Sequence, residues 1–454
     1  MDLIINGAIG QRIDEAAQGK FELITLTASE TAALTSGAGL RTVNGARNIV
    51  LGEKIVHNAR GREGGIYRCS ESDCAVKLYS DVHRDTRKEK KLRDMIKMQN
   101  FGQGICWPKD VLTYNRKFVG FLMPMVSGEQ LSDILFQSAQ DEDFATRMPK
   151  YDRRFQVDMI LGILKLFREL HEKGILVGDI NTRKIMVDPN DASKVTFVDM
   201  DRVQFSVYNC PSTTFGYDSP EVILQNGREG ATERTEGGVF KFTEHYSRCY
   251  RTWENEYYAI AVLLHKIMMP DCAPYSVSDR NGSVTDEEAL ARCADSVYPY
   301  SADQTAMSPD KTAWYSVWSH FPSFLKEAFA NVFSSTRKRY TVDEWTEIFR
   351  RYKTILENGE LEAVDPLCYQ YAQAEPIEFE KTEFILSSQV ELSGFSFEQI
   401  IRRIGVLFKD ALLDEKAGEI ADGLKLSPVF EIGKYRFELI YNMGVLKKIR
   451  CKSF

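Results

Sequence analysis

The alternation of apolar and polar residues predicts a strand-rich first part of the chain. CAVKLY at residues 74–79 and FVGFLMP at residues 118–124 have the pattern of strands, and Pro124 ends the second because proline cannot continue a central ladder. The run at residues 51–69, LGEKIVHNARGREGGIYRC, predicts two strands around a glycine-containing loop. Between these strands, TRKEKKLRDMIKM at residues 86–98 predicts a helix, and we expect most of its lysines to lie on a solvated face.

The middle of the chain predicts a helix followed by two short strands. LGILKLFRELHEKG at residues 161–174 has apolar residues at three- and four-residue spacing, with Gly174 as a C-cap. KIMVD at residues 184–188 and KVTFVD at residues 194–199 are rich in strand-forming residues. The turn residues 189–191 join them, so we expect a hairpin.

The rest of the chain predicts further helices and a separate small module. ENEYYAIAVLLHKIMM at residues 254–269 is apolar enough for a buried helix, and RYTVDEW precedes another helix, capped by Thr341 or Asp343. Beyond residue 361 a strand at 383–392, an amphipathic helix at 395–413 with a capping-box pattern, and a hairpin at 435–451 are predicted. The first 50 residues fit either a strand-rich cap or an extension, and the sequence does not decide.

Composition excludes several classes of function. The 454 residues carry a formal charge of −7, and no basic run is typical of a nucleic-acid or membrane-surface protein. The longest apolar run is too short to span a bilayer, and MDLIINGAIG lacks a signal-peptide pattern. Nine scattered cysteines indicate reduced thiols, and the spacing of Cys69 and Cys74 does not fit a CxxC metal site. We therefore expect a cytoplasmic protein.

Candidate chemistry centres on a lysine and two aspartates. Asp179 follows the predicted helix at 161–174 and Asp199 follows the hairpin. Lys77 lies inside an apolar strand, where its charge is costly unless it is paired, and Glu89 on the next helix offers a carboxylate. Gly61 lies in the loop between the first strands, where a backbone without Cβ atoms can approach phosphate oxygens.

Several motifs in one order resemble the eukaryotic-like Ser/Thr protein kinases, and most of all a bacterial branch of them. These are W-P at 107–108, V-G-F-L-M-P at 119–124, V-G-D-x-N at 177–181 and D-x-D-x-x-Q at 199–204. Ser219-Pro220-Glu221 also resembles the A-P-E motif that closes the activation segment, whose glutamate would pair with Arg339. The likeness covers roughly residues 50 to 355.

The resemblance implies roles for these residues. Asp179 would be the catalytic base that accepts the proton of the substrate hydroxyl, and Asp199 would hold Mg²⁺ or Mn²⁺ on the phosphates of ATP. Lys77 would contact the α- and β-phosphates and pair with Glu89. The remaining nucleotide-binding positions would be Gly61 and Gly64 over the phosphates, Ile66 and Ala75, the gatekeeper Met123, and backbone groups of Met125 and Val126 at a hinge.

Four positions carry a different residue from the one usual in the resembled family. Gly178 replaces the usual arginine before Asp179, so activity would not depend on a phosphorylated activation loop. Asp201 replaces the D-F-G glycine and would add a second carboxylate near the metals, and Glu256 takes the place of the aspartate that steadies the catalytic loop. Lys184 stands where these kinases place an asparagine that binds the second Mg²⁺.

Lys184 bears most directly on activity. Two unit charges about 4 Å apart interact by roughly 4 kcal/mol at an effective dielectric near 20, and about twice that against a divalent ion. The ammonium would therefore replace one metal, turn toward solvent, or leave a site that no longer binds metal–nucleotide productively. The amide of Asn181 is an alternative ligand, but its spacing from Asp179 is wrong by three residues.

Together these patterns predict an α+β protein with a bilobal, protein-kinase-like fold and a small C-terminal α/β module. The expected parts are an extension at 1–50, an N-lobe at 51–127, a C-lobe at 128–357 and the module at 361–454. The predicted function is transfer of the γ-phosphate of ATP to a protein serine or threonine. The alternatives are a pseudokinase that senses nucleotide or binds partners, and another transfer such as adenylylation; small-molecule kinases of the aminoglycoside type share only the G-D motif.

The expected partners follow from the same resemblance. They are a protein substrate and a protein partner at the C-terminal module, with no nucleic acid and no membrane. The sequence predicts neither the substrate nor the oligomeric state.

Overall fold

The structure is a computed structural model of the 454-residue chain. It describes residues 22–36, 39–45, 47–55, 64–98, 101–137, 143–210, 214, 216–222, 232–234, 240–242, 251–270, 272–275, 286–300, 313–361, 378–381, 406, 429–432, 435–442 and 445–453. Helices and strands are both abundant, which agrees with the expected α+β class. The described chain divides into two compact units, the first made of residues 1–131, 165–215 and 225–256, and the second of residues 132–164, 216–224 and 257–454.

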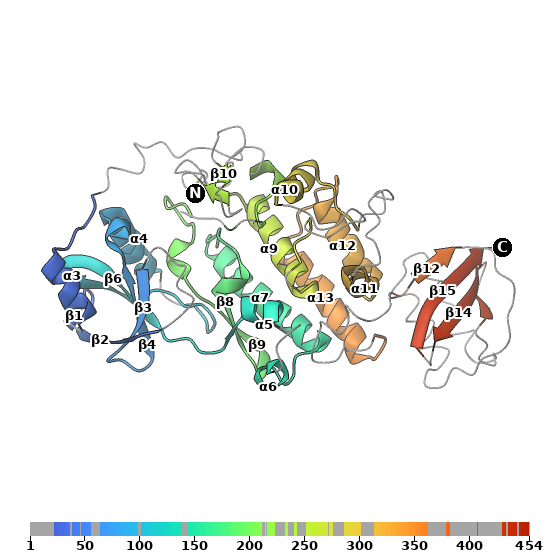
Figure 1. Ribbon diagram of the computed structural model, residues 1–454, viewed down its shortest axis with the longest axis horizontal. Coiled ribbons are helices and arrows are strands. Elements are labelled where there is room, and N and C mark those ends of the chain that lie inside the picture. Colours follow the sequence, from blue (N-terminus) through green and yellow to red (C-terminus); the bar gives the residue numbers. More distant parts are fainter. Residues whose placement is uncertain are drawn as a thin grey trace. The chain divides into compact units, whose positions relative to one another are not determined.

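A closed barrel of six strands dominates the first unit (Figure 1). Its strand order is β1-β2-β3-β4-β6-β5, and neighbouring strands are antiparallel. The predicted strands at 74–79 and 118–124 are confirmed, and Pro124 is the last residue of β6. The strands are β1 (Gly39–Thr42), β2 (Asn48–Lys54), β3 (Gly64–Cys69), β4 (Cys74–Tyr79), β5 (Asp110–Tyr114) and β6 (Lys117–Pro124).

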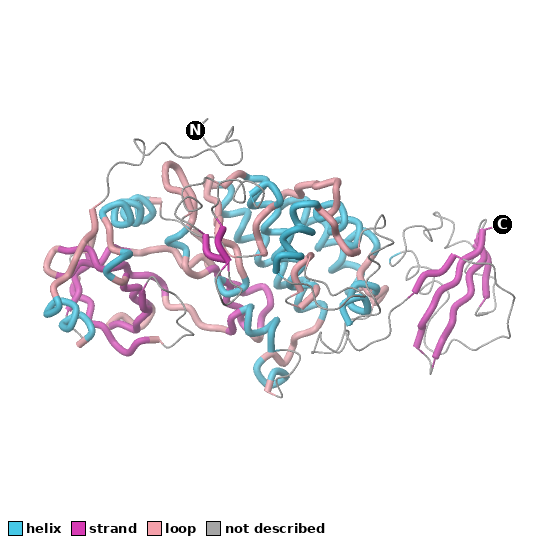
Figure 2. Tube along the Cα trace, turned by 45° about the horizontal axis from the view of Figure 1, so that its top comes forward, coloured by secondary structure: helices cyan, strands magenta, loops and turns pink. Residues whose placement is uncertain are grey.

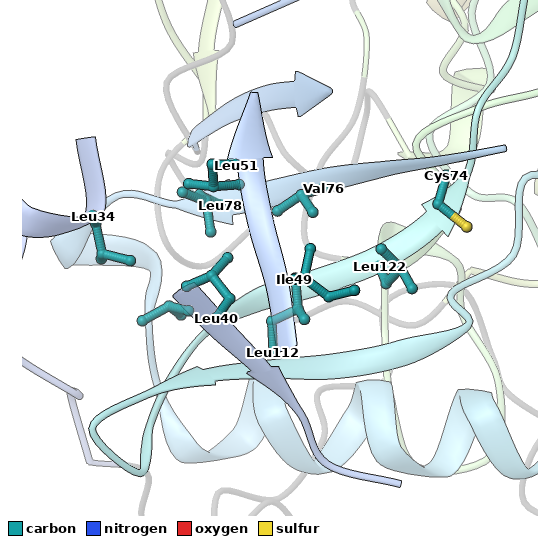
Figure 3. Packing of buried hydrophobic residues seen from close by; sticks show 10 residues of the cluster. Leu34, Leu40, Ile49, Leu51, Cys74, Val76, Leu78, Leu112 and Leu122 are labelled. Carbon is teal, nitrogen blue, oxygen red and sulfur yellow. The ribbon is translucent and has the colours of Figure 1, made fainter. Parts of the chain in front are cut away.

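The barrel interior is filled by aliphatic side chains from most of its strands (Figure 3). Leu40, Ile49, Val76, Leu112 and Leu122 are each fully buried there. Leu34, from the short helix α3 (Ala28–Thr35), packs against the same cluster. Burying a side chain of this kind contributes about 1.5–3 kcal/mol, so this core fixes the position of β4 and its side chains.

Helix α4 (Thr86–Lys97) packs against β5 and β6 of the barrel. The Asp85 side chain accepts a hydrogen bond from the backbone of Lys88 and caps the helix start. At the other end, the indole nitrogen of Trp107 donates to the carbonyl of Met95 at 2.8 Å. The same carbonyl accepts from the backbone nitrogen of Met98 at 2.9 Å, so the tryptophan of the W-P motif adds a second hydrogen bond at the C-terminal end of the helix.

The predicted helix and hairpin in the middle of the chain are both present. Helix α7 (Arg153–Glu172) is followed by Gly174, whose φ of +70° is the left-handed conformation expected just beyond a helix C-terminus. The hairpin pairs β8 (Ile185–Asp188) with β9 (Asp191–Phe197), and β7 (Glu129–Gln130) adds a third strand. The described residues of the first unit also form short 3₁₀ turns and a second hairpin. The turns are η1 (Asp81–His83), η2 (Thr182–Lys184) and η3 (Met200–Arg202), and the hairpin pairs β10 (Thr232–Arg234) with β11 (Phe240–Phe242).

Helices make up most of the described residues of the second unit. They are α5 (Leu131–Gln137), α6 (Phe144–Arg147), α9 (Trp253–Met268), α10 (Asp286–Asp295), α11 (Ala313–Ser319), α12 (Ser323–Phe333) and α13 (Val342–Glu357). Helix α13 begins at an N-cap formed by Thr341, not Asp343, in a capping box with Glu344. The expected pair between Arg339 and Glu221 is present, with a nitrogen–oxygen distance of 2.7 Å.

The C-terminal residues contain a four-stranded sheet (Figure 2). The predicted hairpin at 435–451 is confirmed as β14 (Tyr435–Asn442) paired antiparallel with β15 (Val445–Ser453). The outer strands are β13 (Val429–Ile432), antiparallel to β14, and β12 (Glu378–Lys381), parallel to β15. The predicted strand at 383–392 lies outside the described residues, as does the helix at 395–413 apart from residue 406. No helix within the described ranges is both long and apolar enough to cross a bilayer.

Candidate active site

Lys77 lies in the middle of β4, opposite Ile66 of β3 and Phe121 of β6. Its side chain is buried, with 8% exposed, and its ammonium lies 5.5 Å from the ring centroid of Tyr79 and 5.9 Å from that of Phe121. The ammonium forms ion pairs with the carboxylates of Asp199 and Asp201. The structure thus satisfies the charge that the sequence places inside an apolar strand, and it does so with residues more than a hundred positions away.

Asp199 begins the η3 turn in the left-handed conformation, with φ of +60°. Few residues other than glycine adopt this conformation, although aspartate tolerates it better than most. One oxygen pairs with Lys77, and the other lies 3.9 Å from the ammonium of Lys184 and 4.0 Å from the guanidinium of Arg202. The side chain remains 30% exposed, so this carboxylate faces the open part of the site.

Asp201 was expected to add a second carboxylate near the metals, but its carboxylate is buried against β4. Its side chain is only 1% exposed. One oxygen accepts from the Lys77 ammonium at 2.8 Å and the other accepts from the Tyr79 hydroxyl at 2.5 Å. Both oxygens are therefore engaged by groups of β4, and the carboxylate points away from solvent.

Asp179 is buried and surrounded by donors. One oxygen pairs with the Lys184 ammonium at 2.8 Å and with the Arg202 guanidinium at 3.2 Å. The other accepts from the Thr214 hydroxyl at 2.7 Å, and the Asn181 amide donates to Thr214 at 3.0 Å. Burial alone would raise the pKa of Asp179, but Lys184, Arg202 and Thr214 together hold that pKa well below its usual range. The carboxylate is therefore ionised at neutral pH.

Lys184 and Arg202 connect the two aspartates. Each cation lies within 4.0 Å of both Asp179 and Asp199. The Lys184 side chain is 13% exposed, so of the three alternatives for this residue, the one in which it turns toward solvent is wrong. The two cations balance the negative charge that the buried Asp179 and the partly exposed Asp199 would otherwise concentrate in one place.

The loop before Asp179 is held by a glutamate, as expected from the sequence. The carboxylate of Glu256 accepts from the backbone nitrogens of Val177 at 2.7 Å and Gly178 at 2.9 Å. Gly178 has φ of +72°, and a Cβ there would lie 2.6 Å from the Cβ of Cys210. No side chain fits at position 178 without a shift of Cys210, which explains the glycine in place of the arginine.

Glu89 does not form the expected pair with Lys77. Its carboxylate pairs instead with Arg93, one turn along α4, at 2.6 Å. A glutamate four residues before an arginine is well placed for this pair on a helix surface. The expected solvated face also has an exception, because Lys91 is only 7% exposed. Burial lowers the pKa of Lys91 to about 8, partly opposed by the nearby Cys210 and Asp201.

The predicted nucleotide-binding residues are only partly brought together. Gly61 lies outside the described residues. Gly64 has a structural reason to be glycine, because a Cβ there would lie 1.8 Å from the carbonyl oxygen of Leu78. Met123 is buried opposite Ala75 in the register of β6 with β4.

Met125 and Val126 line a different space from the lysine and the aspartates. They border a hollow of about 610 Å³ whose lining includes residues 101–109 and contains neither Lys77 nor Asp199. The backbone nitrogen of Met125 donates to the carbonyl of Asp73 at 2.9 Å, so this donor is already used. The expected adenine contacts through the nitrogen of Met125 are therefore not available in this conformation.

Three residues of the site were not singled out from the sequence. Tyr79 follows Lys77 by two positions, the strand spacing that places side chains on one face, and this signal was available. Arg202 and Thr214 reach Asp179 only through the turns that follow Asp199, and no local pattern indicates that contact.

Comparison with known proteins agrees with the resemblance at a coarse level. No family model matches the chain. Over 263 residues it is 25% identical to protein kinase YegI of Escherichia coli O157:H7, which covers 54% of this chain and 35% of that protein. Over 293 residues it is 24% identical to protein kinase YegI of Escherichia coli strain K12, covering 61% of this chain and 40% of that one.

The chain is a distant relative of proteins named protein kinases. In each comparison the match spans less than half of the relative's own length. The relationship therefore supports a kinase-like family and does not identify a substrate.

Proposed function

We propose that this chain is an ATP-dependent protein kinase that transfers the γ-phosphate to a serine or threonine hydroxyl. In this proposal the barrel and α4 form the N-lobe of a bilobal kinase-like fold, with lobes at 51–127 and 128–357. The module at 361–454 binds a protein partner. The distant likeness to protein kinase YegI supports the proposal without extending to that protein's whole activity.

One observation carries the proposal. Lys77, Asp179 and Asp199, which lie far apart in the sequence, belong to one continuous set of ion pairs in the first unit. Taking a charge out of water costs several kcal/mol, so apolar side chains would stabilise the fold at least as well if the site had only a structural role. In such a set the lysine can bind the phosphates of a triphosphate, one carboxylate can hold the metal ion on those phosphates, and the other can orient a hydroxyl.

Each side chain has a role that follows from its surroundings. Asp179 is ionised and hydrogen-bonded, so it accepts a hydrogen bond from the substrate hydroxyl and orients its oxygen toward the phosphate. Lys77 exchanges part of its contact with Asp199 for the α- and β-phosphates. Lys184 and Arg202 lie beside both aspartates and neutralise charge on the transferring group.

The donor set fits one divalent cation. Asp199 has a partly exposed carboxylate and is the residue that would hold Mg²⁺ or Mn²⁺. Asp201 does not fit this role, because both of its oxygens accept buried hydrogen bonds from β4. A bound cation would supply charge neutralisation of the phosphates, and the Lys184 ammonium takes the place of a second one.

A pseudokinase is the second candidate, and one contact favours it. Lys184 and Arg202 both occupy the same oxygen of Asp179, which reduces the capacity of that oxygen to accept a substrate proton. Such a site would bind nucleotide without transferring phosphate, and the conformation of the nucleotide-bound chain would be recognised by a partner. The Lys184→Asn variant separates the candidates, because it would raise turnover of a pseudokinase and lower that of a kinase that uses Lys184.

The test measures binding and transfer on the same preparation of the full chain. Purified protein is incubated with γ-labelled ATP, Mg²⁺ or Mn²⁺ and a generic protein substrate, while affinity is measured with a fluorescent ATP analogue. We expect binding and labelled serine or threonine. Binding without transfer would favour the pseudokinase, and neither binding nor transfer would overturn both candidates.

A further inference from the structure

We infer that Asp201 is the positioning residue for Lys77, in place of the helix glutamate Glu89. The orientation of the ammonium is then set by the η3 turn and β4, and not by helix α4. The inference rests on the proposed function only where it concerns phosphate binding, since the contacts themselves belong to the described structure.

The geometry around Asp201 is that of a buried anchor. Lys77 and Tyr79 are two residues apart on β4, so their side chains project from the same face of the strand. They converge on the two oxygens of one carboxylate, at 2.8 Å and 2.5 Å. A two-point contact fixes the orientation of the carboxylate, and that orientation fixes the ammonium.

The two aspartates beside Lys77 differ in exposure and in their other partners. Asp199 is 30% exposed, and its second oxygen faces Lys184 and Arg202. Asp201 is 1% exposed, and its second oxygen is bonded to Tyr79. If Asp199 turned toward a bound cation, Asp201 would still compensate the charge of Lys77, so the lysine would keep its place.

Glu89 is engaged elsewhere and in a weaker setting. Its pair with Arg93 joins side chains that are 22% and 40% exposed on one helix. Pairs of this kind contribute only a few tenths of a kcal/mol in helices. Loss of Glu89 should therefore leave Lys77 where it is.

Chemical labelling of Lys77 tests the anchor without any nucleotide. The full chain is treated with formaldehyde and a mild hydride donor, and the methylation rate of Lys77 is followed by mass spectrometry of its peptide. Asp201→Asn is compared with Glu89→Gln, a matched change from carboxylate to amide, and the exposed Lys97 serves as an internal standard for the reagent. Circular dichroism confirms that each variant is folded.

The expected result separates the two carboxylates. We expect Lys77 to be methylated roughly fivefold faster or more in Asp201→Asn, because the ammonium then loses the buried one of its two carboxylate partners and keeps only the partly exposed Asp199, and within about twofold of wild type in Glu89→Gln. Asp201→Gly, which restores the glycine of the resembled family, serves as a second variant if the amide does not fold. Faster methylation in Glu89→Gln, or an unchanged rate in both Asp201 variants, would overturn the inference.

Nucleotide affinity distinguishes this inference from the proposed function. With a fluorescent ATP analogue and Mg²⁺ we expect Asp201→Asn to weaken binding about tenfold and Glu89→Gln to leave it within about twofold. Equal weakening by both variants would contradict the replacement of Glu89 by Asp201. A wild-type chain that binds no nucleotide would overturn the proposed function, and the labelling rates would still decide which carboxylate holds Lys77.

Discussion

Charge compensation governs the residues of the candidate site. Three cations and three carboxylates, Lys77, Lys184, Arg202, Asp179, Asp199 and Asp201, are joined by contacts of 4.0 Å or less. Removing one member of such a set leaves a buried charge without compensation, which costs about 3–5 kcal/mol in typical cases. Each member can therefore be tested by a single substitution.

Lys184→Met should lower kcat for phosphate transfer by about 10²- to 10³-fold, the usual effect of removing one preorganised donor from developing charge. The KM for ATP should change less, because Lys77 and Asp199 remain. Steady-state kinetics with a peptide or protein substrate measures both parameters. Lys97→Met, at an exposed position of α4, is the control and should match wild type. A Lys184→Met enzyme with the kcat of wild type would show that the ammonium takes no part in phosphate transfer.

Helix α4 is the element whose attachment differs most from the expectation. Without a bond from Glu89 to Lys77, it is tied to the turn after η3 by two side-chain contacts. Asp94 accepts from the Tyr208 hydroxyl at 2.6 Å, and the Arg87 guanidinium donates to Asn209 at 2.8 Å. Trp107 adds a bond to the Met95 carbonyl. The helix is therefore joined to residues 208 and 209 as well as to the barrel.

Tyr208→Phe should loosen α4 while preserving the packing of the ring. A hydrogen bond to a charged acceptor contributes roughly 1.5–3 kcal/mol, and the loss of one should raise the amide exchange rate in the helix by about tenfold or more. Hydrogen exchange with mass spectrometry of the α4 peptides measures this change. Tyr114→Phe, on β5, is the matched control. Exchange in α4 that is the same in both variants would show that Tyr208 does not hold the helix.

Local patterns predicted much of the fold because each depends on neighbouring residues. Strands β2, β3, β4 and β6 of the barrel, α7 with its Gly174 cap and the hairpin of β14 and β15 follow from periodicity and turn residues, whereas β1 and β5 were not predicted. The pair of Glu221 with Arg339 followed from motif order. The partner of Lys77 could not be found this way, because it depends on the left-handed backbone at Asp199, which turns Asp201 inward.

At the scale of the whole molecule, a buried histidine in the second unit makes stability depend on pH. The Nδ1 of His265 donates to the Cys272 carbonyl at 3.0 Å, and its Nε2 lies 3.1 Å from the Tyr298 hydroxyl, which donates to it. This arrangement needs the neutral ring. Burial lowers the pKa of His265 to about 3, despite the bond to Cys272.

The sign of the effect follows from proton binding. Below the ordinary pKa of 6.5 the unfolded state binds a proton at this position, and the folded state does not until about pH 3. The stability from His265 is thus fully present above about pH 6.5 and falls by about 1.4 kcal/mol per pH unit as the pH is lowered through this window. Thermal unfolding of wild type and His265→Phe between pH 7 and pH 5 measures it. We expect a shallower pH slope in the variant, and equal slopes would contradict this account.

The most direct test of the central claim is the initial rate of γ-phosphate transfer by wild type and by Asp179→Asn, measured at equal nucleotide occupancy. The account predicts transfer by the wild-type chain and a loss of about 10³-fold or more in the variant, since the amide can no longer accept the hydroxyl proton. An Asp179→Asn rate equal to that of wild type would contradict it.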